Sequence, residues 1–221
     1  MKIVAGILTD DIEELEKRVQ MTVGLVEWVQ IDFIDGEYAD NLTVAPFEVS
    51  LKSFQEKGLK FEAHLMVSED NLSEWLRQAL EAGFNRISTQ IESIKDLDVY
   101  ISLVKESGRE IGVSLDLDTR VEIIELGILK KLDVVQIMTV GAGFSGQEFV
   151  HNMLWKVREL RELRNKNPEL KFLIEVDGGV NEKTIKMVKD EGVDLAEVNS
   201  GLYNKGEFSE NLKKLDEKIR T

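Results

Sequence analysis

The sequence predicts an α/β protein with a single closed (β/α)8 barrel, a TIM barrel. Three observations support this prediction: eight short apolar runs rich in strand-forming residues, a charged stretch with helical spacing after most of them, and a length of 221 residues. No linker, low-complexity segment or change of composition interrupts the series. We therefore expect one barrel domain over residues 1–221.

The eight apolar runs are expected to be parallel strands, because strands that alternate with helices form parallel sheets. They cover Lys2–Leu8, Trp28–Ile34, Lys60–Val67, Phe84–Thr89, Glu110–Leu115, Leu132–Val140, Lys171–Val176 and Asp194–Asn199. Helices are expected around Ile12, Leu15 and Val19, over Leu51–Lys57, around Leu72, Trp75, Leu76 and Leu80, and over Ile94–Glu106, Val121–Leu129, Met153–Asn165, Glu182–Glu191 and Glu207–Arg220.

Residues that begin and end helices support these assignments. A glycine that can adopt a left-handed conformation follows four of the predicted helices, at Gly58, Gly83, Gly108 and Gly192. Asp70, Asn71 and Asn181 stand where helix N-caps are expected. The alternative is an open, doubly wound sheet, which normally carries a glycine-rich turn after its first strand. Here Leu8-Thr9-Asp10-Asp11 follows the first run, so the barrel is favoured.

Composition narrows the possible partners. The formal net charge of −14 disfavours nucleic acid, and any phosphate site must be built locally from backbone N–H groups. Without cysteine the chain has no disulfide and no thiolate metal site. No run approaches the roughly 18 apolar residues of a membrane span. The N-terminus turns acidic too early for a signal peptide, so we expect a cytoplasmic protein.

Candidate catalytic residues lie at the ends of strands, where barrel enzymes place their chemistry. Gln30 and Asp32 share one side of the second strand, and His64 and Met66 share one side of the third. Asp177 ends the seventh strand. A carboxylate in an apolar strand is costly unless it is paired, hydrogen-bonded or bound to metal. By contrast, we interpret Asp35-Gly36 as a turn and His151 as a surface or capping residue.

Small residues follow the last three strands. The sixth is followed by Gly141-Ala142-Gly143-Phe144-Ser145-Gly146, the seventh by Gly178-Gly179, and the eighth by Asn199-Ser200-Gly201. The loops after strands seven and eight commonly hold a phosphate in barrels of this kind. Together these loops predict a phosphate-binding rim.

From Met1 to about Tyr203, the chain resembles the ribulose-phosphate 3-epimerases. The resemblance is carried, in order, by Ile31-Asp32-Phe33-Ile34-Asp35-Gly36, Asn41-Leu42-Thr43, His64-Leu65-Met66-Val67, Met138-Thr139-Val140, Gly143-Phe144-Ser145-Gly146-Gln147 and Glu175-Val176-Asp177-Gly178-Gly179-Val180.

The resemblance implies a metal-assisted proton transfer at C3 of a ketose phosphate such as ribulose 5-phosphate. Asp32 and Asp177 match the acid and the base, and together with His64 they match metal ligands. Gln30 stands where the family has a further histidine ligand. Residues matched to substrate or phosphate contacts are Thr9, His64, Met66, Met138, Gly143, Phe144, Ser145, Gly146, Gly178, Gly179, Asn199 and Ser200. Barrels of this family commonly associate through their outer helices, so the resemblance is compatible with a homo-oligomer.

Five departures from the family pattern fall on the site: Gly6, Gln30, Gln90, Ser145 and Asn199. An amide oxygen at Gln30 suits Mg²⁺ or Mn²⁺ better than Zn²⁺. We therefore expect a divalent cation (Zn, Mn, Mg or Fe) that is bound more weakly than in the family, or not at all. Two other functions remain open: a different isomerase or lyase that reuses the same barrel, and a phosphate-sugar-binding protein without catalysis.

Overall fold

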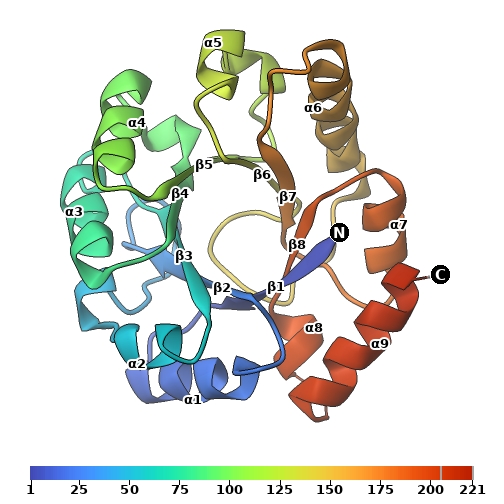
Figure 1. Cartoon of the computed structure of the whole chain (residues 1–221). Coiled ribbons are helices and arrows are strands. Elements are labelled where there is room, and N and C mark those ends of the chain that lie inside the picture. Colours follow the sequence, from blue (N-terminus) through green and yellow to red (C-terminus); the bar gives the residue numbers. More distant parts are fainter. Residues whose placement is uncertain (205, 221) are drawn as a thin grey trace.

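Eight parallel strands close into a barrel in the computed structural model, which describes residues 1–204 and 206–220 (Figure 1). The strands are β1 Lys2–Ile7, β2 Trp28–Ile34, β3 Lys60–Met66, β4 Arg86–Gln90, β5 Glu110–Leu115, β6 Val134–Met138, β7 Leu173–Asp177 and β8 Leu195–Val198. Each strand pairs with its neighbours in sequence, and β1 pairs with β8 to close the ring. The predicted fold class, a (β/α)8 barrel, is confirmed.

Helices form an outer ring around the strands (Figure 1). They are α1 Ile12–Thr22, α2 Lys52–Gln55, α3 Leu72–Ala82, α4 Leu97–Glu106, α5 Leu126–Leu129, α6 Leu154–Lys166, α7 Ile185–Asp190, α8 Ser200–Tyr203 and α9 Phe208–Arg220. Short 3-10 turns occur at η1 Pro46–Glu48, η2 Ile91–Ser93, η3 Val121–Ile123 and η4 His151–Met153.

Side-chain alternation along each strand separates an apolar core from a polar barrel interior. On β2, Val29, Ile31 and Phe33 are buried in the large core between the strands and the helices. Gln30 and Asp32 point to the opposite side, into the barrel. All seven residues of β2 are buried, because helices cover one face of the strand and the other face lines the closed interior.

A buried arginine organises the lower part of the barrel interior. Arg86 contacts Glu62 at 2.8 Å, Glu110 at 2.7 Å and Glu175 at 3.7 Å. Its guanidinium also stacks over the Trp28 ring, 4.0 Å from the centroid. Burying a charge is costly unless it is paired, so these contacts are what permit an ionised side chain here.

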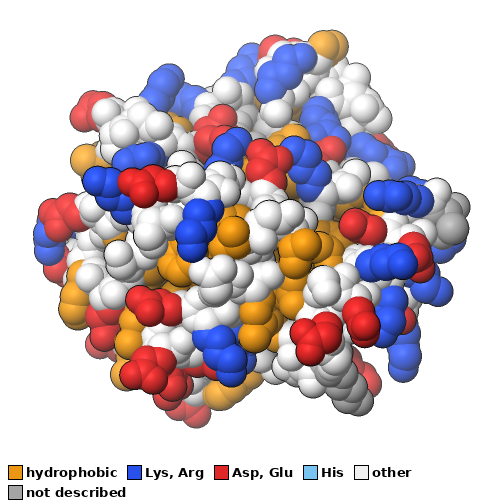
Figure 2. Space-filling model, turned by 60° about the horizontal axis from the view of Figure 1, so that its bottom comes forward, with side chains coloured by type: hydrophobic (Ala, Val, Ile, Leu, Met, Phe, Trp, Pro, Cys, Tyr) orange, Lys and Arg blue, Asp and Glu red, His pale blue; other side chains and the backbone are white. Residues whose placement is uncertain are grey.

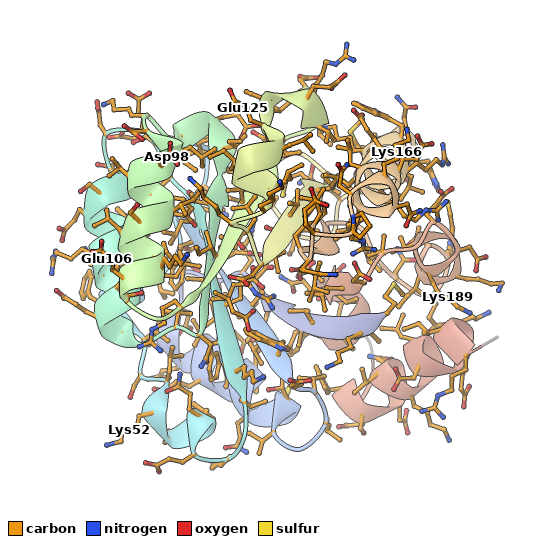
Figure 3. All side chains as sticks on the ribbon, turned by 45° about the horizontal axis from the view of Figure 1, so that its top comes forward. Lys52, Asp98, Glu106, Glu125, Lys166 and Lys189 are labelled. Atoms are coloured by element: carbon orange, nitrogen blue, oxygen red, sulfur yellow. The ribbon has the colours of Figure 1, made fainter. Side chains whose placement is uncertain are left out.

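The outer surface carries charges of both signs. Lys and Arg are interspersed with Asp and Glu on the face shown in Figure 2. Figure 3 labels examples that lie on the outer ring of helices, such as Lys52, Glu106 and Lys166. Within the described residues, no helix has the length and apolar character needed to cross a membrane.

Several helix bounds differ from the sequence prediction. The expected helix Val121–Leu129 is two short pieces, η3 and α5, in which Val121 and Leu129 are buried whereas Ile123 and Leu126 are exposed. The expected helix Leu51–Lys57 shortens to Lys52–Gln55, and Glu182–Glu191 shortens to Ile185–Asp190. The short helix α8 was not predicted, so α9 is the second helix after β8.

The predicted helix ends are partly confirmed. The four glycines Gly58, Gly83, Gly108 and Gly192 all have positive φ, as expected for residues that end helices. Asn71 is the N-cap residue of α3, as predicted, whereas the N-cap of α7 is Thr184 and not the predicted Asn181. The Asn71 side chain makes no cap bond to α3 and instead donates to the Asp35 carboxylate at 2.9 Å. Asn181 accepts from the Lys183 N–H at 2.9 Å in a turn that precedes α7.

Candidate active site

A cleft opens at the carboxyl ends of the strands, under the loop that follows β6. In Figure 1 this loop, drawn in yellow, lies across the barrel opening. Twelve residues singled out from the sequence line the cleft: Asp32, Met66, Met138, Gly143, Phe144, Ser145, Gly146, Asp177, Gly178, Gly179, Asn199 and Ser200. Residues more than 150 positions apart are therefore brought to one rim by closure of the barrel.

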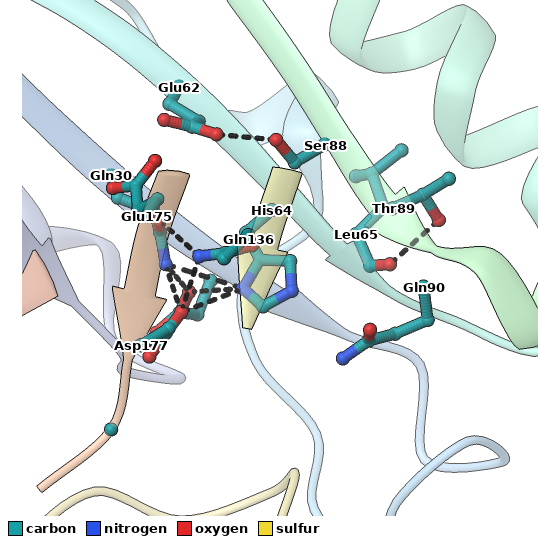
Figure 4. Close-up of polar contacts among 12 residues, drawn as sticks. Gln30, Glu62, His64, Leu65, Ser88, Thr89, Gln90, Gln136, Glu175 and Asp177 are labelled. Carbon is teal, nitrogen blue, oxygen red and sulfur yellow. Dashed lines mark hydrogen bonds and ion pairs between the residues drawn. The ribbon is translucent and has the colours of Figure 1, made fainter. Parts of the chain in front are cut away.

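Four polar side chains meet at and beneath this cleft: Asp32 and Asp177 line it, and the fully buried Gln30 and His64 lie next to them. Figure 4 shows Gln30, His64 and Asp177 of this cluster. The Gln30 Nε2 lies 2.7 Å from Asp32 Oδ1 and 2.6 Å from Asp177 Oδ2. His64 Nδ1 lies 3.2 Å from each of the same two oxygens. Asp32 and His64 are register partners on β2 and β3, while Asp177 comes from β7 on the other side of β1 and β8. The two carboxylates thus face each other across two intervening strands.

The electrostatics of the cluster follow from burial and proximity. Burial lowers the pKa of His64, but hydrogen bonds and charges from Asp177 and Asp32 outweigh it and raise that pKa to about 10. Burial raises the pKa of Asp32, and the neighbouring charge of Asp177 raises it further. At neutral pH the imidazole is therefore a cation that offsets part of the negative charge of the aspartates.

The same cluster contains a candidate metal-binding group. Asp32, His64 and Asp177 offer three ligand atoms that lie within 4.8 Å of one another. Gln30, expected from the sequence as a fourth ligand, presents Nε2 to them and turns Oε1 toward Gln136. An amide nitrogen is a hydrogen-bond donor only. As arranged, the four residues do not fit a four-ligand metal site.

Two further polar residues inside the barrel, Gln136 and Glu197, were not predicted from the strand ends. Gln136 on β6 donates to Asp177 Oδ2 at 2.8 Å and to Gln30 Oε1 at 2.9 Å. Glu197 on β8 lines the cleft, is 3% exposed, and its Oε1 has no hydrogen-bond partner. Burial raises the pKa of Glu197 well above the usual carboxyl value, and the charges of Asp177 and Asp32 add to the effect.

A signal for both residues was present in the sequence. Gln136 stands two positions before Met138 and Glu197 two before Asn199, so each shares a strand face with a predicted rim residue and lies one layer deeper. An isolated polar residue in an apolar strand indicates a side chain that points into the barrel interior. Such a buried side chain needs a hydrogen-bonding partner. The partner itself is visible only in three dimensions.

The two positions after β7 leave no room for a side chain, which explains the glycines there. Gly178 and Gly179 have φ values of 108° and 67°. A Cβ on Gly179 would lie 2.6 Å from the Phe149 backbone nitrogen, and a Cβ on Gly178 would overlap Val140. This close approach packs the β7 loop against the segment that follows β6. Both loops can therefore present backbone to the cleft.

Side-chain amides hold the shape of the loop that follows β6. The Gln147 side-chain amide donates to the carbonyls of Gly141 at 2.7 Å and Phe144 at 2.8 Å, and Asn41 donates to the Gly143 carbonyl at 2.6 Å. Phe144 at the loop tip is exposed. The loop is thus held closed by amides from its own far end and from the segment after β2.

Not every residue singled out from the sequence reaches the cleft. Thr9 is absent from its lining, and the Thr9 hydroxyl accepts a hydrogen bond from the Asp11 N–H at 3.1 Å, near the start of α1. Gln90 is fully buried and donates to Asp116 at 3.5 Å, apart from the aspartate cluster (Figure 4). His151 is exposed at the start of η4, as expected of a surface residue.

Asp35 forms the predicted turn and also ties two loops together. Its Oδ1 accepts from the N–H groups of Glu37 and Tyr38, both at 2.9 Å, and Gly36 has a φ of 80°. Its Oδ2 accepts from the Ser68 N–H at 2.7 Å, so the loop after β2 is joined to the loop after β3. The interpretation of Asp35-Gly36 as a turn is confirmed.

Comparison with known proteins agrees with this geometry. A sequence model described as the ribulose-phosphate 3 epimerase family matches residues 2–203. The chain belongs to the ribulose-phosphate 3-epimerase family. Members of this family are isomerases of the racemase and epimerase type that act on carbohydrates. The resemblance inferred from the sequence motifs is thereby confirmed.

Curated members of the epimerase family cover almost the whole chain. The ribulose-phosphate 3-epimerase of Bacillus subtilis is 32% identical over 208 residues, which is 94% of this chain and 94% of that protein. The one from Aquifex aeolicus is 33% identical over 218 residues, covering 97% and 96%. The one from Schizosaccharomyces pombe is 32% identical over 206 residues, covering 92% and 87%.

Solved structures show the same fold at low sequence identity. A structure titled 3-keto-L-gulonate-6-phosphate decarboxylase from Vibrio cholerae has a TM-score of 0.67 at 13% identity, with 99% and 97% coverage. A structure titled 3-hexulose-6-phosphate synthase has a TM-score of 0.70 at 14% identity, with 99% and 100% coverage. At such identity these likenesses support the barrel fold alone.

Proposed function

We propose that the protein is an epimerase that interconverts ketose phosphates at C3, of the ribulose 5-phosphate/xylulose 5-phosphate type. Membership of the family supports the class of substrate. One observation carries the chemistry: two carboxylates from strands that are separated by two others, Asp32 on β2 and Asp177 on β7, line one cleft. Inversion at a carbon requires a base on one face of the substrate and an acid on the other.

In the proposed reaction one aspartate takes the proton from C3, leaving an enediolate. The other aspartate delivers a proton to the opposite face of C3. This exchange requires one carboxyl to be protonated while its partner is ionised, and the raised pKa of Asp32 favours such a shared state. The two residues would exchange roles in the reverse direction.

The surrounding side chains would orient the pair. Gln30 and His64 hold one oxygen of each aspartate by hydrogen bonds, which leaves the second oxygen of each outside these bonds. Met66 and Met138 pack with Ile34 and form an apolar wall of the cleft. Such a wall would exclude water from a reactive enediolate.

The substrate phosphate would lie at the rim made by Gly143–Gly146, Gly178–Gly179 and Asn199–Ser200. Backbone N–H groups of these small-residue loops are the donors proposed for it. Asp32, His64 and Asp177 are the candidates for a divalent cation, which in this chemistry would polarise the substrate oxygens. No step proposed above depends on that ion.

The test follows the C3 proton of ribulose 5-phosphate in deuterated water by NMR. The parent protein should exchange it and form xylulose 5-phosphate. Asp32→Asn and Asp177→Asn should each slow the exchange by about 10²–10⁴-fold, the usual contribution of general acid–base groups. Asp10→Asn, at an exposed position after β1, is the matched control and should leave the rate unchanged.

The same experiment separates the two alternative functions. Binding of ribulose 5-phosphate without any exchange would identify a phosphate-sugar-binding protein and contradict the proposal. Cleavage or decarboxylation of a related sugar phosphate, in place of epimerisation, would identify another barrel enzyme of this group.

A further inference from the structure

Gln136 occupies a central place beneath the two aspartates. It is fully buried inside the barrel on β6. Its Nε2 contacts both Asp177 Oδ2, at 2.8 Å, and Gln30 Oε1, at 2.9 Å (Figure 4). The Gln136 side chain therefore links the Gln30 amide to Asp177, which the Gln30 amide also contacts directly.

These contacts determine which way both amides point. The Gln136 atom that contacts Asp177 is its N–H2 group, which donates to the carboxylate oxygen. The Gln30 atom beside the same N–H2 group must then be an acceptor, which is Oε1. It follows that Gln30 turns its own N–H2 group toward Asp32 and Asp177.

The Gln30 nitrogen then lies where the three candidate metal ligands meet. It is 2.7 Å from Asp32 Oδ1, 2.6 Å from Asp177 Oδ2 and 3.3 Å from His64 Nδ1. Its two hydrogens match the two carboxylate oxygens, one each. Gln30 thus joins by hydrogen bonds two of the atoms, Asp32 Oδ1 and Asp177 Oδ2, that a divalent ion would join by coordination.

Conversion to a metal site is opposed by Gln136. For Gln30 to become a ligand, its Oε1 would have to turn toward the aspartates and its N–H2 group toward Gln136. Two N–H2 groups would then face each other at the present 2.9 Å contact. Gln136 cannot relieve this by turning over, because its carbonyl oxygen would then face the Asp177 carboxylate.

We infer that Gln136 acts through Gln30 as a positioning residue that keeps the Asp32–His64–Asp177 cluster from binding a divalent cation tightly. The aspartates are held instead by the Gln30 amide and the His64 ring. This inference goes beyond the proposed epimerisation and does not depend on it, since it concerns metal affinity and makes no claim about turnover.

The test compares metal affinities by isothermal titration calorimetry with Zn²⁺ and Mn²⁺, after removal of bound metal by a chelator. Gln136→Leu removes the amide that fixes Gln30. We expect it to bind both ions at least about tenfold more tightly than the parent, on the scale by which groups around a metal site change its affinity. Gln90→Leu is the matched control, because Gln90 is an equally buried interior glutamine outside the cluster. It should bind metal as the parent does.

A decrease in metal affinity on replacing Gln136 would overturn the inference. If Gln136 instead supported a bound metal by orienting Asp177, Gln136→Leu would bind metal about 10–100-fold more weakly than the parent. Equal, tight binding by parent and variant would overturn it as well. Gln136→Met, a variant of similar length without hydrogen-bonding groups, decides the question if the leucine variant does not fold.

A second measurement reports directly on Gln30. In the parent, the ¹H–¹⁵N signals of the Gln30 side-chain amide should not change when Zn²⁺ is added at concentrations that saturate Gln136→Leu. A large change in the parent at these concentrations would contradict the inference. If the metal affinities are as predicted but the protein does not exchange the C3 proton, only the proposed function is overturned.

Discussion

The carboxylate of Glu197 fills the space left by the missing side chain of Gly6. A Cβ built on Gly6 would overlap Glu197 Oε1, and would also lie 2.9 Å from Glu197 Cγ. Glycine at position 6, one of the departures seen in the sequence, therefore has a partner on β8. The two positions should behave as one unit when either is changed.

Gly6→Ser should destabilise the protein by about 1–3 kcal/mol, the usual cost of overpacking a filled interior. In a Glu197→Val background the same serine should cost much less, since the carboxylate no longer occupies its place. Urea unfolding of the four proteins in this double-mutant cycle measures the coupling, which should be about 0.5–3 kcal/mol. Additive effects would show that the two residues do not share this space.

Replacing Arg86 should destabilise the barrel strongly. Arg86→Met leaves Glu62 and Glu175 buried without their cation, and breaking a buried pair in this way costs about 3–5 kcal/mol. Unfolding by urea at pH 7 measures the loss. Arg77→Met is the control, because Arg77 pairs with Glu74 and Glu81 on the exposed face of α3. A loss no greater than that of the control would contradict the buried role of Arg86.

The Asp35 turn should make stability depend on pH in acid. Burial raises the pKa of Asp35, but hydrogen bonds from Tyr38, Asn71, Ser68 and Glu37 outweigh it and lower that pKa below its ordinary value. The stabilisation is therefore present above the ordinary carboxyl pKa of about 3.9 and is lost as pH falls through the lower folded-state pKa.

Asp35→Asn should accordingly be less stable than the parent at pH 7, because its N–H2 group faces the donors of Ser68 and Asn71. The difference should shrink as the pH falls below about 3.9, the ordinary carboxyl pKa, because the stabilisation by the parent's ionised carboxylate is then lost. Urea midpoints of both proteins between pH 3 and pH 7 measure this. A difference that stays constant with pH would exclude the carboxylate charge as its source.

Adding a methyl group at Gly179 should disturb the cleft. Gly179→Ala places a side chain at a φ of 67°, 2.6 Å from the Phe149 backbone nitrogen, so the β7 loop must shift. We expect a stability loss of about 1–3 kcal/mol, typical of strain at such a backbone position, and a raised KM for the sugar phosphate. Gly127→Ala is the control: its Cβ meets nothing within 4 Å, and it lies in α5. Unchanged KM in Gly179→Ala would argue against a phosphate site at this loop.

Much of the fold could be predicted because it depends on local patterns. The eight apolar runs coincide with the eight strands to within about two residues at most ends, and the four helix-ending glycines have the expected φ. Short helices were the weak point. The apolar residues of Val121–Leu129 suggested a helix, but Ile123 and Leu126 turned out to face solvent. Only packing against the barrel determines which of several apolar residues is buried.

The rim of the cleft was also predictable, since strand ends in a barrel must meet at one mouth. Asp32, Asp177 and the loops around Gly143 and Gly179 could be assigned to that mouth from their positions after strands. Thr9 shows the limit of such reasoning. It follows a strand as the others do, yet its hydroxyl is engaged near the start of α1.

The sequence by itself determined the strand–helix alternation, and through it which residues reach the mouth of the barrel. Only the tertiary structure decided how Gln30 is used. Its amide is oriented by Gln136, 106 positions away along the chain, and the Gly6 space is filled by Glu197 from the last strand. The physical reason is that an amide can donate or accept, and a cavity can be filled from any strand. The choice depends on neighbours that barrel closure brings together.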